Sequence, residues 1–187
     1  MKVVSLDLPE VLRFEPRVFG DSRGYFFESW VAERYAAAGV PAVFVQDNVS
    51  RSRSGVLRGI HLQHPHAQGK LVTVLEGAVF DIAVDVRFGS PRFGQWCGAH
   101  LSADNHHQLW VPPGFAHGFL VLSDYATFAY KCTAPYHPEA ELVLRWDDPT
   151  IGVAWPEPPS ELSVRDASGL LLDDVPRHRL PVYDRDA

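Results

Sequence analysis

Residues 70–85, with the sequence KLVTVLEGAVFDIAVD, decide the fold class of this chain. They form two runs rich in β-branched and apolar side chains, and the Glu76-Gly77 pair between the runs is a turn signal. This pattern predicts two β-strands joined by a tight turn. Lys70 stands at the start of the first strand, and a charged group beside so much core sequence requires a functional reason.

Further strands follow at short, regular spacing on both sides of this segment. Such strands with short connections predict an all-β domain of antiparallel strands, for which a jelly-roll barrel with a few short helices is the most economical form. A short helix is expected at residues 29–38, with Ser29 as its N-cap and Gly39 just after its end. The expected strands are residues 44–49, 55–63, 70–76, 79–87, 95–101, 108–111, 118–122 and 126–132.

At 187 residues the chain is long enough for one well-buried domain and short for two. No internal repeat or low-complexity linker divides it, so we expect a single domain over residues 1–187, with its core at about residues 10–150. The proline-rich tail, residues 151–187, loses the strand rhythm. We expect this tail to wrap the surface, with a short helix or turn near residues 163–169.

Composition and charge exclude several classes of partner. The net charge of −6 argues against nucleic acid or an anionic membrane surface. No window approaches the run of about 18 apolar residues that a membrane span needs, and the first residues lack the layout of a signal peptide, so a cytoplasmic protein is expected. Cys97 and Cys132 lack metal-site spacing and are expected to be buried and reduced.

Histidine motifs indicate a cupin-like barrel without a metal. The stretch from His61 to His66 and the Pro-Gly-x-x-His motif that ends at His117 are similar to the two cupin motifs. Metal-binding cupins place a carboxylate four or five residues after the first motif, and here the fourth residue after His66 is Lys70. Because a lysine ammonium would repel a dication, the sequence favours a metal-free site.

His61 and Lys70 together suggest proton abstraction next to a carbonyl group. His61 would be the base, and Lys70 would hold the negative charge that develops on oxygen. Arg58 lies three residues before His61, which puts it on the opposite face of an ideal strand unless a bulge at Gly59 resets the alternation. Arg58 is otherwise a solvated edge charge, and a strand histidine alone is as often a core residue as a base.

Motifs along nearly the whole chain resemble the dTDP-4-dehydrorhamnose 3,5-epimerase family. One departure is Leu62, where the family commonly has tyrosine; we expect it to change the packing beside His61 without removing the chemistry. The motifs are FGDSRG (19–24), FFE (26–28), QDN (46–48), VLRGIH (56–61), QGKLV (68–72), FDIAVDVR (80–87), GSP (89–91), WVPPGFAHGF (110–119), YKCT (130–133), WDDP (146–149) and LSVRD (162–166).

The resemblance implies a cofactor-independent isomerase acting on a dTDP-4-keto-6-deoxy-hexose. The expected reaction converts dTDP-4-keto-6-deoxy-D-glucose to dTDP-4-keto-L-rhamnose, with proton removal and return at C5 and C3 through an enolate. By the family's pattern His61 is the base and Tyr130 is the acid that returns a proton. Asp166 would orient and charge-stabilise His61, and Lys70 would stabilise the enolate oxygen.

The same resemblance implies a set of substrate-binding residues. Arg23 and Arg58 would bind the diphosphate, Tyr136 would stack on thymine, and His117 would lie in the substrate pocket. The family is a homodimer in which amino-terminal strands pair across the interface, which would bring residues such as Arg23 and Glu28 to the neighbour's site. The remaining binding residues expected from the family are Phe26, Glu28, Gln46, Asn48, Glu141 and Arg165.

Three alternatives remain open at the level of sequence. A relative with the same chemistry could epimerise only C3 or only C5, for another dTDP-deoxysugar pathway, because that choice depends on small differences in placement of the catalytic groups. A metal-dependent cupin oxygenase is disfavoured by Lys70. A non-catalytic cupin that binds sugar nucleotides is disfavoured by the joint presence of His61, Lys70, Tyr130 and Asp166.

Overall fold

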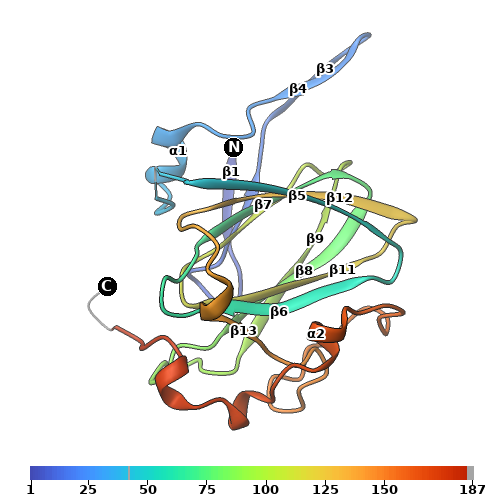
Figure 1. Ribbon diagram of the computed structural model, residues 1–187. Coiled ribbons are helices and arrows are strands. Elements are labelled where there is room, and N and C mark those ends of the chain that lie inside the picture. Colours follow the sequence, from blue (N-terminus) through green and yellow to red (C-terminus); the bar gives the residue numbers. More distant parts are fainter. Residues whose placement is uncertain (42, 185–187) are drawn as a thin grey trace.

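The protein is built from two antiparallel β-sheets that face each other (Figure 1). The computed structural model describes residues 1–41 and 43–184. One sheet has six strands, in the order β1 (Lys2–Ser5), β2 (Leu12–Glu15), β10 (Gln108–Val111), β7 (Lys70–Glu76), β12 (Tyr125–Cys132) and β5 (Gln46–Arg53). The other has five, in the order β13 (Glu141–Val143), β6 (Leu57–Gln63), β11 (Phe115–Val121), β8 (Ala78–Asp85) and β9 (Trp96–Ser102).

This architecture confirms the prediction of an all-β fold with antiparallel strands and few helices. β7 and β10 begin and end at the predicted residues, and the other predicted strands are displaced by a few residues at most. The turn at Gly77 carries the chain from one sheet to the other. Gly77 has φ +76°, and a Cβ there would lie 1.9 Å from the carbonyl oxygen of Tyr125, so only glycine fits this corner.

The predicted helix at residues 29–38 is shorter than expected. Helix α1 spans Ala32–Ala36, its N-cap is Val31, and no side chain caps it, so the prediction of Ser29 as the cap was wrong. Ser29 instead offers its carbonyl oxygen to the Tyr35 hydroxyl, at 3.1 Å, and to Gln108 Nε2, at 3.0 Å. Tyr35 is a buried residue of α1 and Gln108 comes from β10 of the sheet, so packing of the helix on the sheet overrides the local capping preference.

Two layers of apolar side chains cover the two faces of the five-stranded sheet. Between the sheets, Val72, Val74 and Phe128 pack against Phe119 and Val121. The outer face of the five-stranded sheet is covered by the chain after β13 (Figure 1). Its cluster includes Ile60, Ile82, Val84 and Leu142 from the sheet and Leu144, Ile151, Leu172, Val175 and Leu180 from the chain after β13.

The tail wraps the sheet as predicted and carries a short helix near the expected place. Helix α2 spans Val164–Ala167, and its N-cap Ser163 accepts a hydrogen bond from the backbone N–H of Asp166. Three single turns of 3₁₀ helix complete the elements, η1 (Pro138–Ala140), η2 (Leu172–Asp174) and η3 (Arg177–Arg179). Division of the chain into one domain over residues 1–187 stays a prediction.

An exposed hairpin projects from the body of the molecule (Figure 1). It consists of β3 (Val18–Asp21) and β4 (Gly24–Phe27), which pair only with each other in the described chain. Tyr25 is 62% exposed and Phe26 is 64% exposed. Large aromatic side chains on a two-stranded arm are typical of a surface that another chain covers.

Two remaining observations bear on the sequence predictions. Cys97 and Cys132 are both buried and free, as expected. Within the described residues, no helix has the length and apolar character that a membrane crossing requires.

Candidate active site

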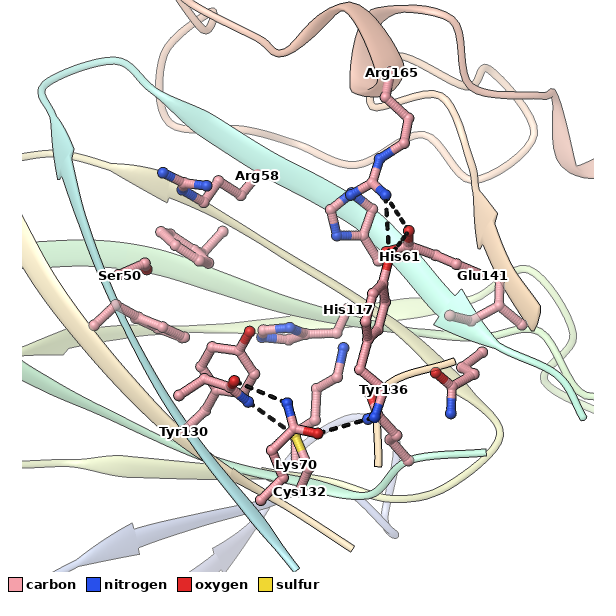
Figure 2. Close-up of a pocket in the computed structure, with 17 residues that line it drawn as sticks. Ser50, Arg58, His61, Lys70, His117, Tyr130, Cys132, Tyr136, Glu141 and Arg165 are labelled. Carbon is pink, nitrogen blue, oxygen red and sulfur yellow. Dashed lines mark hydrogen bonds and ion pairs between the residues drawn. The ribbon is translucent and has the colours of Figure 1, made fainter. Parts of the chain in front are cut away.

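A cavity of about 300 Å³ lies between the two sheets and is lined by side chains from both (Figure 2). The six-stranded sheet contributes inward-facing residues of β5, β7 and β12, and the five-stranded sheet contributes residues of β6 and β11. Glu141 at the start of β13 and Arg165 of α2 line its edge. A ligand in this cavity would therefore be enclosed by two walls that belong to different sheets.

A bulge in β6 brings Arg58 and His61 to the same wall. His117 of β11 pairs with His61, but Phe119, two residues later, pairs with Arg58, three residues earlier on β6. β6 therefore carries one extra residue, which resets its alternation. The bulge passes through Gly59, which has φ +132° and whose Cβ would lie 2.6 Å from Gly118 Cα. Both side chains line the cavity, so Arg58 is not merely an edge charge.

His61 forms a short hydrogen bond with a buried carboxylate. Its Nε2 lies 2.6 Å from Asp166 Oδ1, and the two side chains are 21% and 5% exposed. Burial raises the pKa of Asp166. The hydrogen bond and the charge of His61 act in the opposite direction, as do the hydrogen bond with Ser163 and the charge of Arg165, and the net effect is a lowered pKa. Asp166 is thus ionised at neutral pH, and it fixes the orientation of the imidazole ring and stabilises the ring when protonated.

Lys70 presents its ammonium group to the cavity from the opposite wall (Figure 2). Burial lowers the pKa of Lys70, and nearby Cys132, Glu141 and Asp81 act in the opposite direction. Within the described residues Lys70 makes no ion pair with a carboxylate, so its positive charge is directed to whatever occupies the cavity. A preorganised cation of this kind stabilises negative charge that develops on a ligand oxygen.

Tyr130 lies on β12, in the same wall as Lys70 and across the cavity from His61 (Figure 2). Burial raises the pKa of Tyr130, and the charge of Arg58 opposes this shift. The phenol therefore stays protonated at neutral pH and can donate its proton. His61 and Tyr130 thus place a proton acceptor and a proton donor on two facing walls.

A second histidine in the cavity also bonds to a carboxylate. His117 Nε2 lies 2.9 Å and 3.0 Å from the two carboxylate oxygens of Asp81, which is fully buried. Burial raises the pKa of Asp81, and His117 lowers it by its charge and its hydrogen bond. Asp81 was not among the predicted site residues. Its position as the one charged residue within the apolar run 78–84 is the signal that could have identified it.

The mouth of the cavity is bordered by linked polar side chains. Tyr136 donates its hydroxyl proton to Glu141 Oε2 at 2.9 Å, and Arg165 forms an ion pair with the same carboxylate. On β5, Gln46 Nε2 donates to Asn48 Oδ1 at 2.9 Å. All five were predicted as binding residues from the sequence, and all five line the cavity.

Three predicted binding residues lie outside the cavity of their own chain. Arg23 is 88% exposed on the hairpin arm and forms an ion pair with Asp21. Glu28 follows the arm and forms an ion pair with Arg34. Phe26 is exposed on the same arm. A binding role for these residues would require the arm to reach another copy of the chain.

Sequence reasoning missed several cavity residues. The hydroxyl of Ser50 is buried and has no hydrogen-bond partner among the described residues, and Cys132 accepts a weak hydrogen bond from Asn48 Nδ2 at 3.7 Å. Ser50 follows the predicted residue Asn48 by two positions on β5, and Cys132 follows the predicted residue Tyr130 by two positions on β12, so strand alternation could have identified both. The others are Gln63, Gln68, Phe119 and Phe128, together with Leu62, which borders the cavity although its side chain packs in the outer cluster.

Leu62 lies on the other face of β6 from His61. It is buried in the outer cluster opposite Leu142 and therefore packs against the tail side of the sheet. Among the described residues, no group of three or more His, Cys, Asp or Glu side chains is arranged to hold a metal ion. A site without a metal or cofactor stays a prediction.

Comparisons with known proteins agree on one family. The family model described as dTDP-4-dehydrorhamnose 3,5-epimerase matches residues 5–174. The dTDP-4-dehydrorhamnose 3,5-epimerase of Pseudomonas aeruginosa is 53% identical over 177 residues, which cover 94% of this chain and 98% of that protein.

Two solved structures show the same fold with different ligands. The dTDP-6-deoxy-D-glucose-3,5-epimerase of Legionella pneumophila, in complex with dTDP-4-keto-L-rhamnose, has a TM-score of 0.95, 50% identity and coverage of 98% of both chains. A 3'-monoepimerase of Streptomyces bikiniensis, in complex with dTDP-quinovose, has a TM-score of 0.88 and 35% identity, with coverage of 98% of this chain and 93% of that one.

The lowered pKa of Asp166 predicts a pH-dependent contribution to stability. The pKa of Asp166 in the folded chain is below its ordinary value of 3.8, so the ionised carboxylate stabilises the folded chain above that pH. This contribution is lost as the pH falls through the lowered folded value. Asp166→Asn should therefore reduce the free energy of unfolding more at pH 6 than at pH 3, measured by urea unfolding across this range. Exposed Asp104→Asn is the control, and an equal loss at both pH values would contradict the prediction.

Proposed function

The chain belongs to the dTDP-4-dehydrorhamnose 3,5-epimerase family, and from this premise we propose that it converts dTDP-4-keto-6-deoxy-D-glucose to dTDP-4-keto-L-rhamnose. One observation carries the proposal: a histidine–carboxylate pair and a protonated tyrosine face one cavity from opposite sheets, with a lysine beside the tyrosine. Inversion at carbon requires proton removal on one face and proton return on the other. This arrangement supplies both faces.

The first step is proton abstraction by His61. The C4 ketone acidifies its neighbouring carbons, so the imidazole takes the C5 proton and the electron pair of the C–H bond moves to the C4 oxygen as an enolate. The charge on that oxygen is stabilised by Lys70, and the imidazolium that forms on His61 is stabilised by Asp166. Both interactions are stronger when the bound sugar excludes water from the cavity, because the local dielectric constant is then low.

The second step returns a proton from the other wall. Tyr130 donates its phenolic proton to C5, the enolate returns to a ketone, and the phenolate and imidazolium then exchange protons with solvent. The configuration at C5 is inverted because the donor and acceptor lie on opposite sides of the sugar. Repetition of both steps at C3 completes the double epimerisation.

Binding of the nucleotide follows from the remaining cavity residues. The guanidinium of Arg58, anchored through Nε to Ser52 Oγ at 2.9 Å, keeps its other donors for diphosphate oxygens. Tyr136 supplies an aromatic face for the thymine ring. His117 lies beside the sugar with Asp81 behind it, and it supports binding and orientation of the ketone.

We propose further that the active form is a homodimer with exchanged amino-terminal strands. The exposed aromatic side chains of the β3–β4 arm and the distance of Arg23, Phe26 and Glu28 from their own cavity support this assembly. In the dimer, these residues would complete the neighbour's site. A cytoplasmic location is also proposed, and the free thiols of Cys97 and Cys132 are compatible with a reducing compartment.

Epimerisation at a single carbon is the second candidate function. The likeness to a 3'-monoepimerase, at a TM-score of 0.88, supports it because the same fold serves that reaction. The two candidates differ in how the base and the acid are placed relative to C3 and C5, and they predict different exchange patterns at these two carbons.

Solvent exchange separates these candidates. The EDTA-treated protein should exchange both the C3 and C5 protons of dTDP-4-keto-6-deoxy-D-glucose in deuterium oxide, followed by proton NMR. His61→Asn should slow the exchange by about 10²- to 10⁴-fold because the base is lost, whereas exposed His178→Asn is a matched control. Exchange at one carbon only would assign a mono-epimerase. Absence of exchange would contradict an epimerase function on this sugar.

Subunit complementation tests the exchanged arm. Neither Arg23→Ala nor His61→Asn homodimers should be fully active, but a heterodimer of the two variants contains one site with both native residues. That heterodimer, purified through two different affinity tags, should recover about half of the wild-type rate. A heterodimer no more active than the two variant homodimers would show that Arg23 does not act in the active site of the other subunit. Exposed Arg53→Ala serves as the arginine control.

A further inference from the structure

Residues 133–137, hereafter the tyrosine segment, run along the mouth of the cavity between β12 and η1 and carry Tyr136. This segment has no partner strand in the described chain, so its backbone groups need other hydrogen-bond partners. Most of these partners are glutamine side chains. They come from β5, from the end of β6 and from the loop before β7, all of which precede the segment by more than 60 residues.

Each glutamine bonds to a different part of the segment. Gln68 Nε2 donates to the Ala134 carbonyl at 2.8 Å. Gln46 Oε1 accepts from the backbone N–H of Tyr136 at 2.9 Å. Gln63 bonds at two points, because its Nε2 donates to the Pro135 carbonyl at 3.0 Å and its Oε1 accepts from the His137 N–H at 2.7 Å.

The hydroxyl end of Tyr136 is held as well. It donates to Glu141, and Glu141 is held by Arg165 of α2. The ring itself remains accessible, since Tyr136 is 44% exposed at the cavity mouth. Backbone and hydroxyl are thus both restrained while the ring face stays open, which is the geometry of a preorganised stacking platform.

We propose that Gln63 and Gln68 are positioning residues that hold the Tyr136 ring in the orientation that stacks on the nucleobase of the ligand. This inference rests on the proposed function, in which Tyr136 receives the thymine of a dTDP-sugar. Gln63 and Gln68 act through the segment backbone, since the amide groups of both bond to it. Gln63 Nε2 also donates to the His66 carbonyl at 2.6 Å, outside the segment. Their loss would leave backbone groups unpaired and free the segment to sample other conformations.

The proposal predicts that the effect of Gln68 on dTDP binding depends on the presence of Tyr136. Gln68→Leu should weaken binding of dTDP, measured by titration calorimetry, by about tenfold, because affinity gained from preorganisation is lost. Tyr136→Ala should weaken it at least as much. In the Tyr136→Ala background, Gln68→Leu should change the Kd by less than about twofold, because the residue through which Gln68 acts is absent.

Controls separate positioning from general damage. Exposed Gln95→Leu should bind dTDP as the wild type does, and thermal unfolding of every variant checks that it is folded. If Gln68→Leu does not fold, Gln63→Glu replaces it, because the carboxylate keeps the acceptor for the His137 N–H and loses the donor to the Pro135 carbonyl.

Two results would overturn the inference in different ways. If Gln68→Leu weakens dTDP binding equally in the wild type and in the Tyr136→Ala background, or does not weaken it at all, Gln68 does not act through Tyr136. Failure of the wild-type protein to bind dTDP would instead overturn the proposed function together with the inference.

Discussion

The hydrogen bond between His61 and Asp166 joins residues that are 105 positions apart, and much of the fold serves to make it. His61 belongs to the barrel wall, whereas Asp166 belongs to the tail. The two can meet only because the tail packs on the outer face of the five-stranded sheet. Gly169 allows the last approach, since a Cβ at that position would lie 2.7 Å from the Leu144 carbonyl carbon.

The cavity places polar groups where a jelly roll would otherwise have its core. The inward positions of β7 and β12 change along the strands from apolar side chains in the cluster between the sheets to Lys70, Tyr130 and Cys132 in the cavity. Burial of such groups costs stability unless they are paired. Asp81 and Asp166 are paired with histidines, and the ammonium of Lys70 is directed to the ligand. Binding and proton transfer thus depend on groups that the fold alone would disfavour.

The fold and most of the cavity residues could be predicted from the sequence because the signals that specify them are local. Strand alternation and turn residues are local signals, and they are strong in a barrel of short strands, so β7 and β10 were placed at their observed bounds. The signals failed where distant contacts decide the outcome. Gly59 could not be assigned a bulge without its neighbour Gly118, and Ser29 was taken as a helix cap although its carbonyl is used by Gln108 and Tyr35. Gln63 and Gln68 were missed because their partners at the tyrosine segment are backbone atoms far along the chain.

The central claim is that the proton acceptor and the proton donor act from opposite faces of the sugar. Tyr130→Phe tests it most directly, by incubation with dTDP-4-keto-6-deoxy-D-glucose in deuterium oxide and NMR analysis of the configuration at C5. His61 would still remove and return a proton on its own face, so deuterium should enter C5 while the original configuration is kept. Inverted, deuterated product at a rate near that of the wild type would contradict the assignment of Tyr130 as the acid on the second face.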